Sequence, residues 1–247
     1  MKNFQFNKEE HYYELDGKRL YGVTTVLSVI AKPALIPWAV KTAIDYIKDN
    51  SSGFQMFEGE QTKFYSGITD ELLDKAKSAH RKKKEEAGAK GTDAHEIIEG
   101  LIQDGIDNNK GFIFGQSDND QVKNFIKWAT DNQVKFLASE KQLYSESAWV
   151  AGTTDMVFEM GGKKYVGDVK TSSAIYPEHF YQMAAYRMML EEMGETGFDG
   201  SVVIRIGKDG KFNEEKDVQY RFDYKTDLNA FLGALAIFKA GETYKIK

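Results

Sequence analysis

The chain has 247 residues, with 33 Lys and Arg against 38 Asp and Glu, which gives a formal charge of −5. It contains no Cys, and this excludes disulfides, thiolate zinc sites, cysteine-ligated iron–sulfur clusters and a cysteine nucleophile. The acidic balance does not favour a general nucleic-acid coat, although a local basic groove on an acidic body is compatible with it.

Neither the start of the chain nor its apolar runs indicate a membrane segment. Residues 1–10 lack the apolar core of a signal peptide. The longest apolar run, Ala230–Phe238, is about half of the roughly 18–20 residues that a membrane span needs. We therefore expect a cytoplasmic protein with no membrane partner.

The first part of the chain, residues 1–133, is predicted to be a hairpin followed mainly by helices. Asp16-Gly17 is a strong two-residue turn signal, and pairing around it places Glu14 opposite Arg19. Residues 50–67 are rich in Ser, Gly and Gln and are expected to form a loop. Helices are expected after Thr24 or Thr25, from Pro37, and over 69–87, 93–104 and 118–131, with a break over Gly88–Gly91.

β-Forming residues dominate the second part, residues 134–247. Strands are expected over 134–144, 153–160, 163–169, 201–206 and 218–222, and helices over 178–193 and 228–239. The resulting order β-β-β-α-β-β-α favours an α/β or α+β fold, with a mixed β-sheet core flanked by helices.

A predicted hairpin carries the most informative chemistry. If Gly161-Gly162 forms its two-residue loop, Asp155 faces Asp168 on the neighbouring strand. Two carboxylates so close need a shared proton or a cation between them. Lys170 projects from the same face as Asp168, which suggests a Mg²⁺ site with a lysine beside the attacking water. The alternative is a solvated face, with Asp155 paired to an arginine.

Four motifs in a fixed order make this pattern more specific. They are Gly91-Thr92-Asp93-Ala94-His95, Gly152-Thr153-Thr154-Asp155, Asp168-Val169-Lys170-Thr171 and Gln182-Met183-Ala184-Ala185-Tyr186. In this order they resemble the RecB-like branch of the PD-(D/E)XK nuclease superfamily. Residues 22–27 and Pro37-Trp38-Ala39 also look like phage-encoded exonucleases of that branch, and the chain is similar to the mitochondrial genome maintenance exonuclease. The resemblance covers residues of about 11–190.

The resemblance implies a single restriction-endonuclease-like nuclease domain over residues 1–247 that binds Mg²⁺ or Mn²⁺. It also implies a role for each matching residue. Lys170 would assist the nucleophile, and Gln182 and Tyr186 would lie at the active site and the DNA. The implied metal ligands are His95, Asp155, Asp168, the Val169 carbonyl and an upstream glutamate, for which Glu140 is the first choice and Glu146 the second. Some relatives hold an iron–sulfur cluster, which a chain without Cys cannot.

Each of these residues also has a simpler interpretation. A lone histidine near a helix start, such as His95, is more often a capping or packing residue than a ligand. Gln182 and Tyr186, four residues apart on one helical face, could form a polar stripe on a helix that packs against the sheet.

Other residues are candidates for binding nucleic acid. The densest positive segment of the chain comprises Arg81, Lys82, Lys83 and Lys84. It is either a solvated helical face or a track for phosphates that lead to the site. Thr171 and Ser172, directly after Lys170, are further candidates. Among the aromatic residues of the first half, which include Tyr12, Tyr13 and Tyr21, most are expected to pack locally, and one or two are candidates for stacking on unpaired bases.

The expected function is that of a metal-dependent DNA exonuclease. It would act on strand ends in phage or bacterial DNA recombination or repair, with a single-strand annealing or recombination protein as a candidate partner. Two alternatives stay open at this point: a relative that binds DNA or a protein without cutting, and an endonuclease of the same superfamily.

Overall fold

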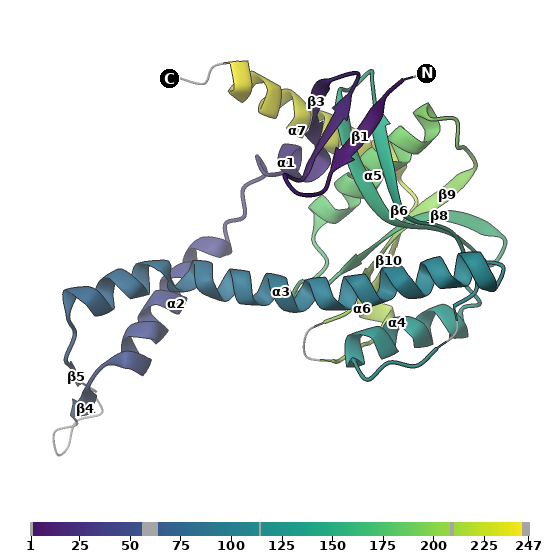
Figure 1. Cartoon of the computed structure of the whole chain (residues 1–247). Coiled ribbons are helices and arrows are strands. Elements are labelled where there is room, and N and C mark those ends of the chain that lie inside the picture. Colours follow the sequence, from purple (N-terminus) through teal and green to yellow (C-terminus); the bar gives the residue numbers. More distant parts are fainter. Residues whose placement is uncertain (1, 56–63, 114, 208–209, 244–247) are drawn as a thin grey trace. The chain divides into compact units, whose positions relative to one another are not determined.

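The computed structural model describes residues 2–55, 64–113, 115–207 and 210–243, with the backbone alone at 54, 55, 64 and 87–92. Its contacts divide the chain into two compact units (Figure 1). One unit joins Met1–Ile30 to Asp93–Lys247, and the other is Ala31–Thr92. The single nuclease domain expected over 1–247 stays a prediction.

The first unit is built on a mixed sheet with the strand order β1-β2-β3-β7-β8-β9-β10, in which β6 also pairs with β7 (Figure 1). Neighbouring strands are antiparallel except for the parallel pairs β3–β7 and β8–β9. The strands are β1 Phe4–Asn7, β2 Tyr12–Leu15, β3 Lys18–Gly22, β6 Lys135–Ser145, β7 Val150–Met160, β8 Lys163–Lys170, β9 Phe198–Arg205 and β10 Val218–Arg221.

The sheet branches at β7. Strand β6 pairs with β7 along almost its whole length, from Val150 to Glu159. The other edge of β7 is shared, because β3 pairs with it at Val150 and Ala151 whereas β8 pairs with it from Met156 onward. Residues 152–155 of β7 therefore lie between the two ladders. This gap is where the candidate site is found.

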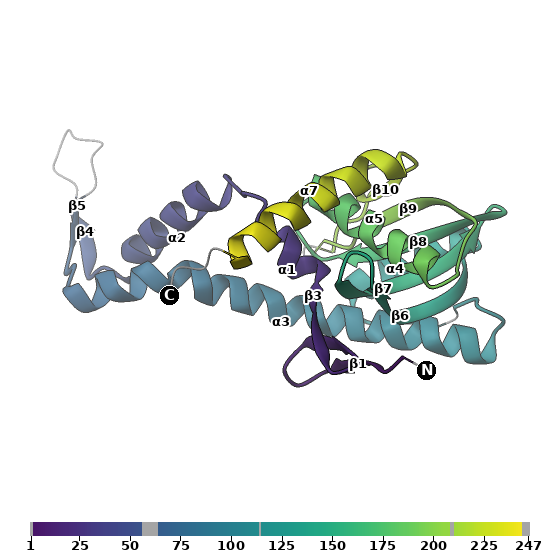
Figure 2. The same ribbon diagram turned by 90° about the horizontal axis from the view of Figure 1, so that it is seen from above.

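Helices cover both faces of the sheet, so the mixed β-sheet core flanked by helices that the sequence predicts is confirmed. Successive residues of β7 point to opposite faces, and Val157 packs in one apolar cluster while Met156 and Phe158 pack in the other. The first cluster includes residues of α1 (Val23–Leu27), α5 (Pro177–Glu192) and α7 (Tyr224–Thr243); Figure 2 shows α5 and α7 side by side. The second includes residues of α4 (Asp120–Asp131) and of α3 from Ala94 onward. Helix α6 (Glu214–Asp217) is a single turn before β10.

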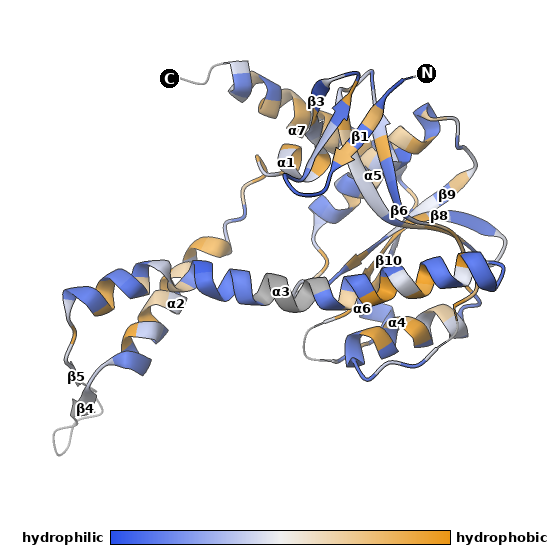
Figure 3. Ribbon diagram, viewed as in Figure 1, coloured by the Kyte–Doolittle hydropathy of each residue, from blue (hydrophilic) through white to orange (hydrophobic). Residues whose placement is uncertain are grey.

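Apolar and polar residues alternate along these covering helices in the manner of half-buried elements. Figure 3 shows apolar residues along α4 and the C-terminal part of α3, separated by polar ones. Val122, Phe125 and Ala129 of α4 recur at helical spacing and are fully or almost fully buried. Asn119 caps this helix, since its side chain accepts a hydrogen bond from the Gln121 N–H at 2.9 Å.

The second unit contains helix α2 (Leu35–Asn50), the two short strands β4 (Gly53–Gln55) and β5 (Phe64–Ser66), and the first part of helix α3 (Asp70–Asn108). Strands β4 and β5 pair antiparallel. In this part of α3 Leu72, Ala76 and Ala79 are buried. Among the described residues of the whole chain, no helix has both the length and the apolar character needed to cross a membrane.

The hairpin predicted around Asp16-Gly17 is confirmed together with its register, since Glu14 pairs with Arg19. The expectation of a mainly helical first part is wrong, because residues 1–133 are mixed and contain β1 to β5 as well as helices. Strand β1 forms because Phe4 and Phe6 alternate and stack on Tyr13 of β2. The loop predicted over 50–67 contains β4 and β5, and its residues 56–63 lie outside the described part.

The helix break predicted over Gly88–Gly91 is also wrong, because α3 is continuous from Asp70 to Asn108. A glycine inside a helix costs about 1 kcal/mol relative to alanine. Extending an existing helix avoids the cost of nucleating a new one. In addition Ala94, Ile98 and Ile102 of the same helix bury their side chains in the core, which favours continuation.

Candidate functional site

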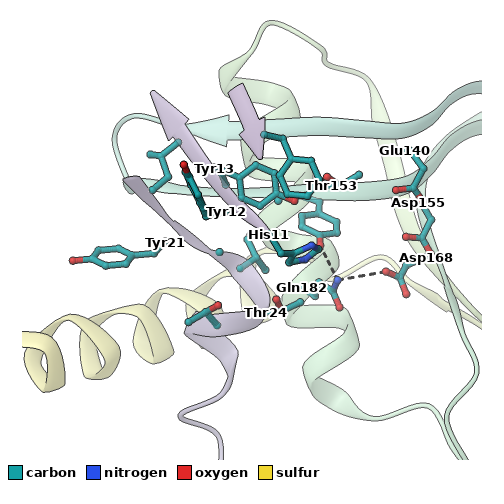
Figure 4. A pocket seen from close by; sticks show the side chains of 18 of the residues that line it. His11, Tyr12, Tyr13, Tyr21, Thr24, Glu140, Thr153, Asp155, Asp168 and Gln182 are labelled. Carbon is teal, nitrogen blue, oxygen red and sulfur yellow. Dashed lines mark hydrogen bonds between the residues drawn. The ribbon is translucent and has the colours of Figure 1, made fainter. Parts of the chain in front are cut away.

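Three carboxylates lie in one row across the neighbouring strands β6, β7 and β8. Glu140 stands opposite Asp155, because the pairs on either side of it are Ser139 with Met156 and Lys141 with Thr154. Asp168 stands opposite Asp155 by the register of β7 with β8, one position beyond the pair of Met156 with Gly167. Figure 4 shows the three side chains along one side of the same pocket. The facing position of Asp155 and Asp168 is the one that the glycine hairpin predicts.

The ladder between β7 and β8 ends at this row, and side chains take over its hydrogen bonds. Asp155 Oδ2 accepts a hydrogen bond from the backbone N–H of Val169 at 2.8 Å. The Thr154 hydroxyl donates to the carbonyl of Gly167 at 3.3 Å. These two contacts hold the end of β8 against β7 beyond the last regular backbone pair. They also fix the position of the Asp155 carboxylate relative to Asp168.

Lys170 is the cation of the acidic row. Its Nζ lies 2.6 Å from Asp168 Oδ2, and the Asp168 side chain is only 1% exposed. Burial alone would lower the pKa of Lys170, but attraction by Asp168 and Asp155 outweighs it, so that this pKa is raised. Lys170 therefore keeps its proton at neutral pH in the protein alone.

The carboxylates have raised pKa values because they share a site with too little positive charge. Burial and the repulsion of Asp155 raise the pKa of Asp168 to about 6, despite the contact with Lys170. Burial also raises the pKa of Asp155, and Glu99 adds to this. The pKa of Glu140 rises to about 8, through loss of water around its carboxyl group and then through repulsion by Asp155, Glu99 and Asp168. These shifts are the electrostatic signature of a site that favours a cation.

Glu140 also has a strained backbone. Its φ is +43°, a left-handed conformation that costs a residue with a side chain roughly 1–3 kcal/mol. The strain interrupts the regular pairing of β6 and β7 at the position that faces Asp155. Such strain is retained where surrounding contacts enforce it, which often marks a functional site.

His95, on α3, reaches the same row from the side. Its Nδ1 lies 3.7 Å from Asp155 Oδ2, and its side chain is 36% exposed. Burial lowers the pKa of His95, with Asp168 opposing this and Lys170 adding to it. A neutral imidazole so close to a carboxylate has a nitrogen lone pair that can bind a metal.

Gln182 and Tyr186 of α5 form a buried polar pair behind the row. The Gln182 amide donates to the Tyr186 hydroxyl at 2.8 Å and lies 3.4 Å from Asp168 Oδ1 (Figure 4). The Tyr186 ring packs directly on Gly152 of β7, where an added Cβ would lie 2.6 Å from Tyr186 Cε1. The two residues are therefore more than a polar stripe, since they link α5 to Asp168.

A pocket of about 740 Å³ contains all of these groups, and its lining belongs entirely to the first unit. The opposite side of the pocket is formed by the β2–β3 hairpin and the start of α1 (Figure 4). The lining residues on this side include several that the sequence resemblance does not single out, namely Phe6, His11, Tyr12, Tyr13, Arg19, Leu20 and Tyr21. The sequence signal for them is weak: aromatic residues near a turn indicate packing as readily as a site.

The remaining predicted site residues are distributed as follows. Val169, Thr171 and Ser172 line the pocket. Glu146, the second choice for the upstream glutamate, is not among the lining residues and forms an ion pair with Lys2. The basic residues Arg81, Lys82, Lys83 and Lys84 are exposed on the part of α3 that belongs to the second unit.

The donor set fits a hard divalent cation. Among the described residues, no group of three or more His, Asp or Glu side chains is already gathered to hold a metal ion. Mg²⁺ needs no such cage, because it is usually bound through one or two carboxylates, waters and the phosphates of a substrate. Asp155 and Asp168 supply two carboxylates, and Asp168 Oδ2 is buried without a well-directed hydrogen bond.

Comparisons with known proteins place the chain near two solved structures at low similarity. No family model and no curated protein matches the sequence. The structure resembles an alkaline exonuclease from Laribacter hongkongensis, with 9% identity, a TM-score of 0.37 and coverage of 92% of each chain. It also resembles the protein SSO0001, with 12% identity, a TM-score of 0.28 and coverage of 48% of this chain and 57% of the other.

Proposed function

We propose that the protein is a metal-dependent nuclease that hydrolyses phosphodiester bonds in DNA, and that it acts as an exonuclease. The observation that carries this proposal is the grouping of Asp155, Asp168 and Lys170 in one pocket, with the ammonium 2.6 Å from a carboxylate oxygen. Two carboxylates and a lysine on adjacent strands suit the hydrolysis of a phosphate ester, whose charge must be balanced as the bond breaks.

Asp155 and Asp168 would hold a Mg²⁺ or Mn²⁺ ion, with the Val169 carbonyl, His95 and Glu140 as further ligands. When bound, such an ion polarises a phosphate oxygen and lowers the pKa of a bound water. The charges of the pocket favour binding of a cation. Three carboxylates are balanced by one ammonium, that of Lys170, and by a histidine whose pKa is lowered.

Lys170 would act on the phosphate and the attacking water. Its pKa is raised, so it carries a proton and can donate hydrogen bonds. An ammonium at this position offsets the negative charge that develops on the phosphate oxygens. It can also orient the attacking water. To accept the proton of that water, Lys170 would first have to lose its own proton, which requires a pKa lower than the raised one it has in the chain by itself.

Gln182 would be a positioning residue for Asp168. Its amide nitrogen lies 3.4 Å from Asp168 Oδ1 and donates to the Tyr186 hydroxyl at 2.8 Å, so the Tyr186 contact holds the nitrogen beside Asp168. Asp168 thereby keeps one oxygen toward the amide and the other toward Lys170. A carboxylate that is already held in its working orientation does not have to be rearranged when the substrate binds.

The experiment that tests the proposal is a digestion time course with the purified chain. End-labelled single-stranded and double-stranded oligonucleotides are incubated with Mg²⁺, with Mn²⁺ and with a chelator. We expect stepwise shortening from an end with either metal and none with the chelator. No cleavage of any DNA under any of these conditions would contradict the proposal.

Covalently closed circular DNA separates the exonuclease from the endonuclease of the same superfamily. An exonuclease that requires an end leaves the circle intact, whereas nicking or linearisation would replace the exonuclease by the endonuclease. The third candidate, a relative that binds DNA or protein without cutting, is disfavoured because such a module has no reason to retain the acidic row with its lysine. A role in phage or bacterial recombination or repair, together with an annealing partner, stays a prediction.

A further inference from the structure

The side of the pocket that faces the acidic row carries a flat stack of two side chains. The Arg19 guanidinium lies over the Tyr12 ring, with 3.8 Å between Cζ and the ring centroid. Both residues line the pocket. The motifs that indicate the nuclease include neither of them.

The hairpin register places these two side chains on the same face of the hairpin. Tyr13 and Leu20 pair across β2 and β3, are buried in an apolar cluster with Leu15 and line another part of the pocket, where the Tyr13 hydroxyl lies 2.9 Å from the Thr153 hydroxyl. Tyr12 and Arg19 are adjacent to them in sequence and therefore point to the opposite face of the hairpin. Figure 4 shows Tyr12 across the pocket from Asp155. The core contacts on one face thus fix the orientation of the stack on the other.

Further contacts hold the stack in place. The Asn7 amide donates to the Tyr12 hydroxyl at 3.3 Å, and Arg19 forms an ion pair with Glu10 at 3.2 Å. The Arg19 side chain is nevertheless 63% exposed. A planar guanidinium that is supported on one side by an aromatic ring and open on the other is a surface on which a second flat group can stack.

We propose that the Tyr12–Arg19 stack binds an unpaired nucleobase of the DNA strand whose phosphate lies at Lys170. This inference rests on the proposed function, because it takes the substrate to be DNA. A nucleotide joins a phosphate to a flat base, and the pocket offers a charged side and a flat side within about 740 Å³. The base must be unpaired, since stacking on a protein surface requires that it leaves its own duplex stack.

The chain offers a matched control for this stack. Arg187 lies over the Tyr224 ring, with 4.3 Å between Cζ and the centroid, and it also pairs with an acid, Glu191. Neither Arg187 nor Tyr224 lines the pocket. Variants of this second stack remove the same chemistry from another place on the same unit.

The test measures binding and cleavage with oligonucleotides that lack one base. Single-stranded oligonucleotides, each with one abasic nucleotide at a different position, are bound to the protein in chelator and digested in Mg²⁺. For the intact oligonucleotide we expect Tyr12→Leu to weaken binding roughly 5- to 150-fold, the range that corresponds to stacking on one base. When the abasic nucleotide is at one or two particular positions, the wild type should bind the oligonucleotide more weakly than the intact one by the same factor. At these positions Tyr12→Leu should bind the abasic oligonucleotide as strongly as it binds the intact one.

Conservative variants separate stacking from charge and from damage to the fold. Tyr12→Phe should bind the intact strand as the wild type does, whereas Arg19→Lys, which keeps the charge but not the plane, should lose affinity for the intact strand only. Tyr224→Leu and Arg187→Lys should leave binding unchanged. Unchanged binding by Tyr12→Leu, or an equal loss on intact and abasic strands, would overturn the inference.

The two arms of the test distinguish this inference from the proposed function. Binding is measured in chelator and needs no cleavage. If the wild type cleaves no DNA but its binding depends on the base through Tyr12, the proposed nuclease fails and the base-binding stack stands. The opposite outcome is that the wild type cleaves DNA and that the ratio of the cleavage rates on intact and abasic strands is the same for Tyr12→Leu as for the wild type. In that case the proposed nuclease stands and the base-binding stack fails.

Discussion

Asp168 Oδ2 lies 2.6 Å from Lys170 Nζ, and the two side chains are 1% and 22% exposed. A buried ion pair contributes little net stability, but removing one partner leaves the other charge buried and unpaired, at a cost of about 3–5 kcal/mol. The pair is therefore a sensitive point for both activity and stability, and these two effects can be separated.

Single substitutions at this pair should abolish cleavage. We expect Asp168→Ala and Lys170→Ala to lose cleavage of labelled DNA in Mg²⁺ while most DNA binding survives. Because part of the site is exposed to solvent, the free energy of unfolding should fall by no more than about 3–5 kcal/mol. The double variant Asp168→Asn/Lys170→Met should regain stability in urea unfolding without regaining activity. Cleavage at the normal rate by either single variant would show that this site is assigned wrongly.

The raised pKa of Glu140 predicts a pH dependence of stability in chelator. The pKa is about 8 in the folded chain, against 4.5 for an ordinary glutamate. Between these values the folded state holds a proton that the unfolded state has lost, so the free energy of unfolding should fall as pH rises from about 4.5 to 8. The residue is exposed to solvent, so the slope should stay well below about 1.4 kcal/mol per pH unit.

Urea unfolding of the wild type and of Glu140→Gln at several pH values in this window checks the prediction. Because glutamine does not titrate, the variant should lose most of the slope between about pH 6 and 8 and gain stability relative to the wild type at high pH, whereas the slope below pH 6, to which the raised pKa of Asp168 contributes, should remain. Glu9→Gln, at an exposed position in the turn before β2, is the control and should keep the wild-type slope. An unchanged slope in Glu140→Gln would show that this carboxyl is not the group responsible.

Binding of Mn²⁺ should depend on the acidic row. Calorimetric titration of the wild type should give a saturable heat, and the bound ion should raise the unfolding free energy by about 2.7 kcal/mol at a hundredfold excess over Kd. Asp155→Asn should weaken binding at least about tenfold, because it removes one of two central carboxylates. Asp131→Asn, in an exposed ion pair on α4, is the control. The absence of any Mn²⁺ heat in the wild type would favour the relative that binds without cutting.

The sequence predicts the sheet half of the molecule well because its signals are local. The glycine turn at 161–162 sets the register of β7 with β8, and this register places Asp155 opposite Asp168. The spacing of Gln182 and Tyr186 puts them on one helical face, and the structure brings both into the pocket. Short hairpins and helices specify such neighbours through residues close in the chain.

The rest of the site depends on contacts between distant segments, which a single sequence does not contain. The β2–β3 hairpin reaches the pocket because β3 pairs with β7 at Val150 and Ala151, more than a hundred positions later in the chain. Glu140, the first choice for the glutamate that the resemblance implies, stands in the row with a left-handed backbone that no local pattern indicates. The continuity of α3 through Gly88 and Gly91 likewise depends on burial elsewhere along the helix.

Gly152 should be required because of the ring that packs on it. A Cβ at this position would lie 2.6 Å from Tyr186 Cε1 and 3.4 Å from the Tyr186 hydroxyl oxygen, so Gly152→Ala must displace the ring. Tyr186 is buried and cannot move into solvent, and we expect a loss of about 1–3 kcal/mol in the free energy of unfolding. Displacement of Tyr186 also breaks its hydrogen bond with Gln182, which contacts Asp168, so cleavage should fall as well.

A double variant shows whether the clash is the cause. Gly152→Ala/Tyr186→Leu removes the ring together with the hydroxyl, so part of the lost stability should return relative to Gly152→Ala while activity stays low. Gly100→Ala, at a helical glycine with open space around it, is the control and should be neutral or slightly stabilising. If Gly152→Ala keeps wild-type stability and wild-type cleavage, the close packing of Tyr186 on β7 does not position Gln182 and Asp168.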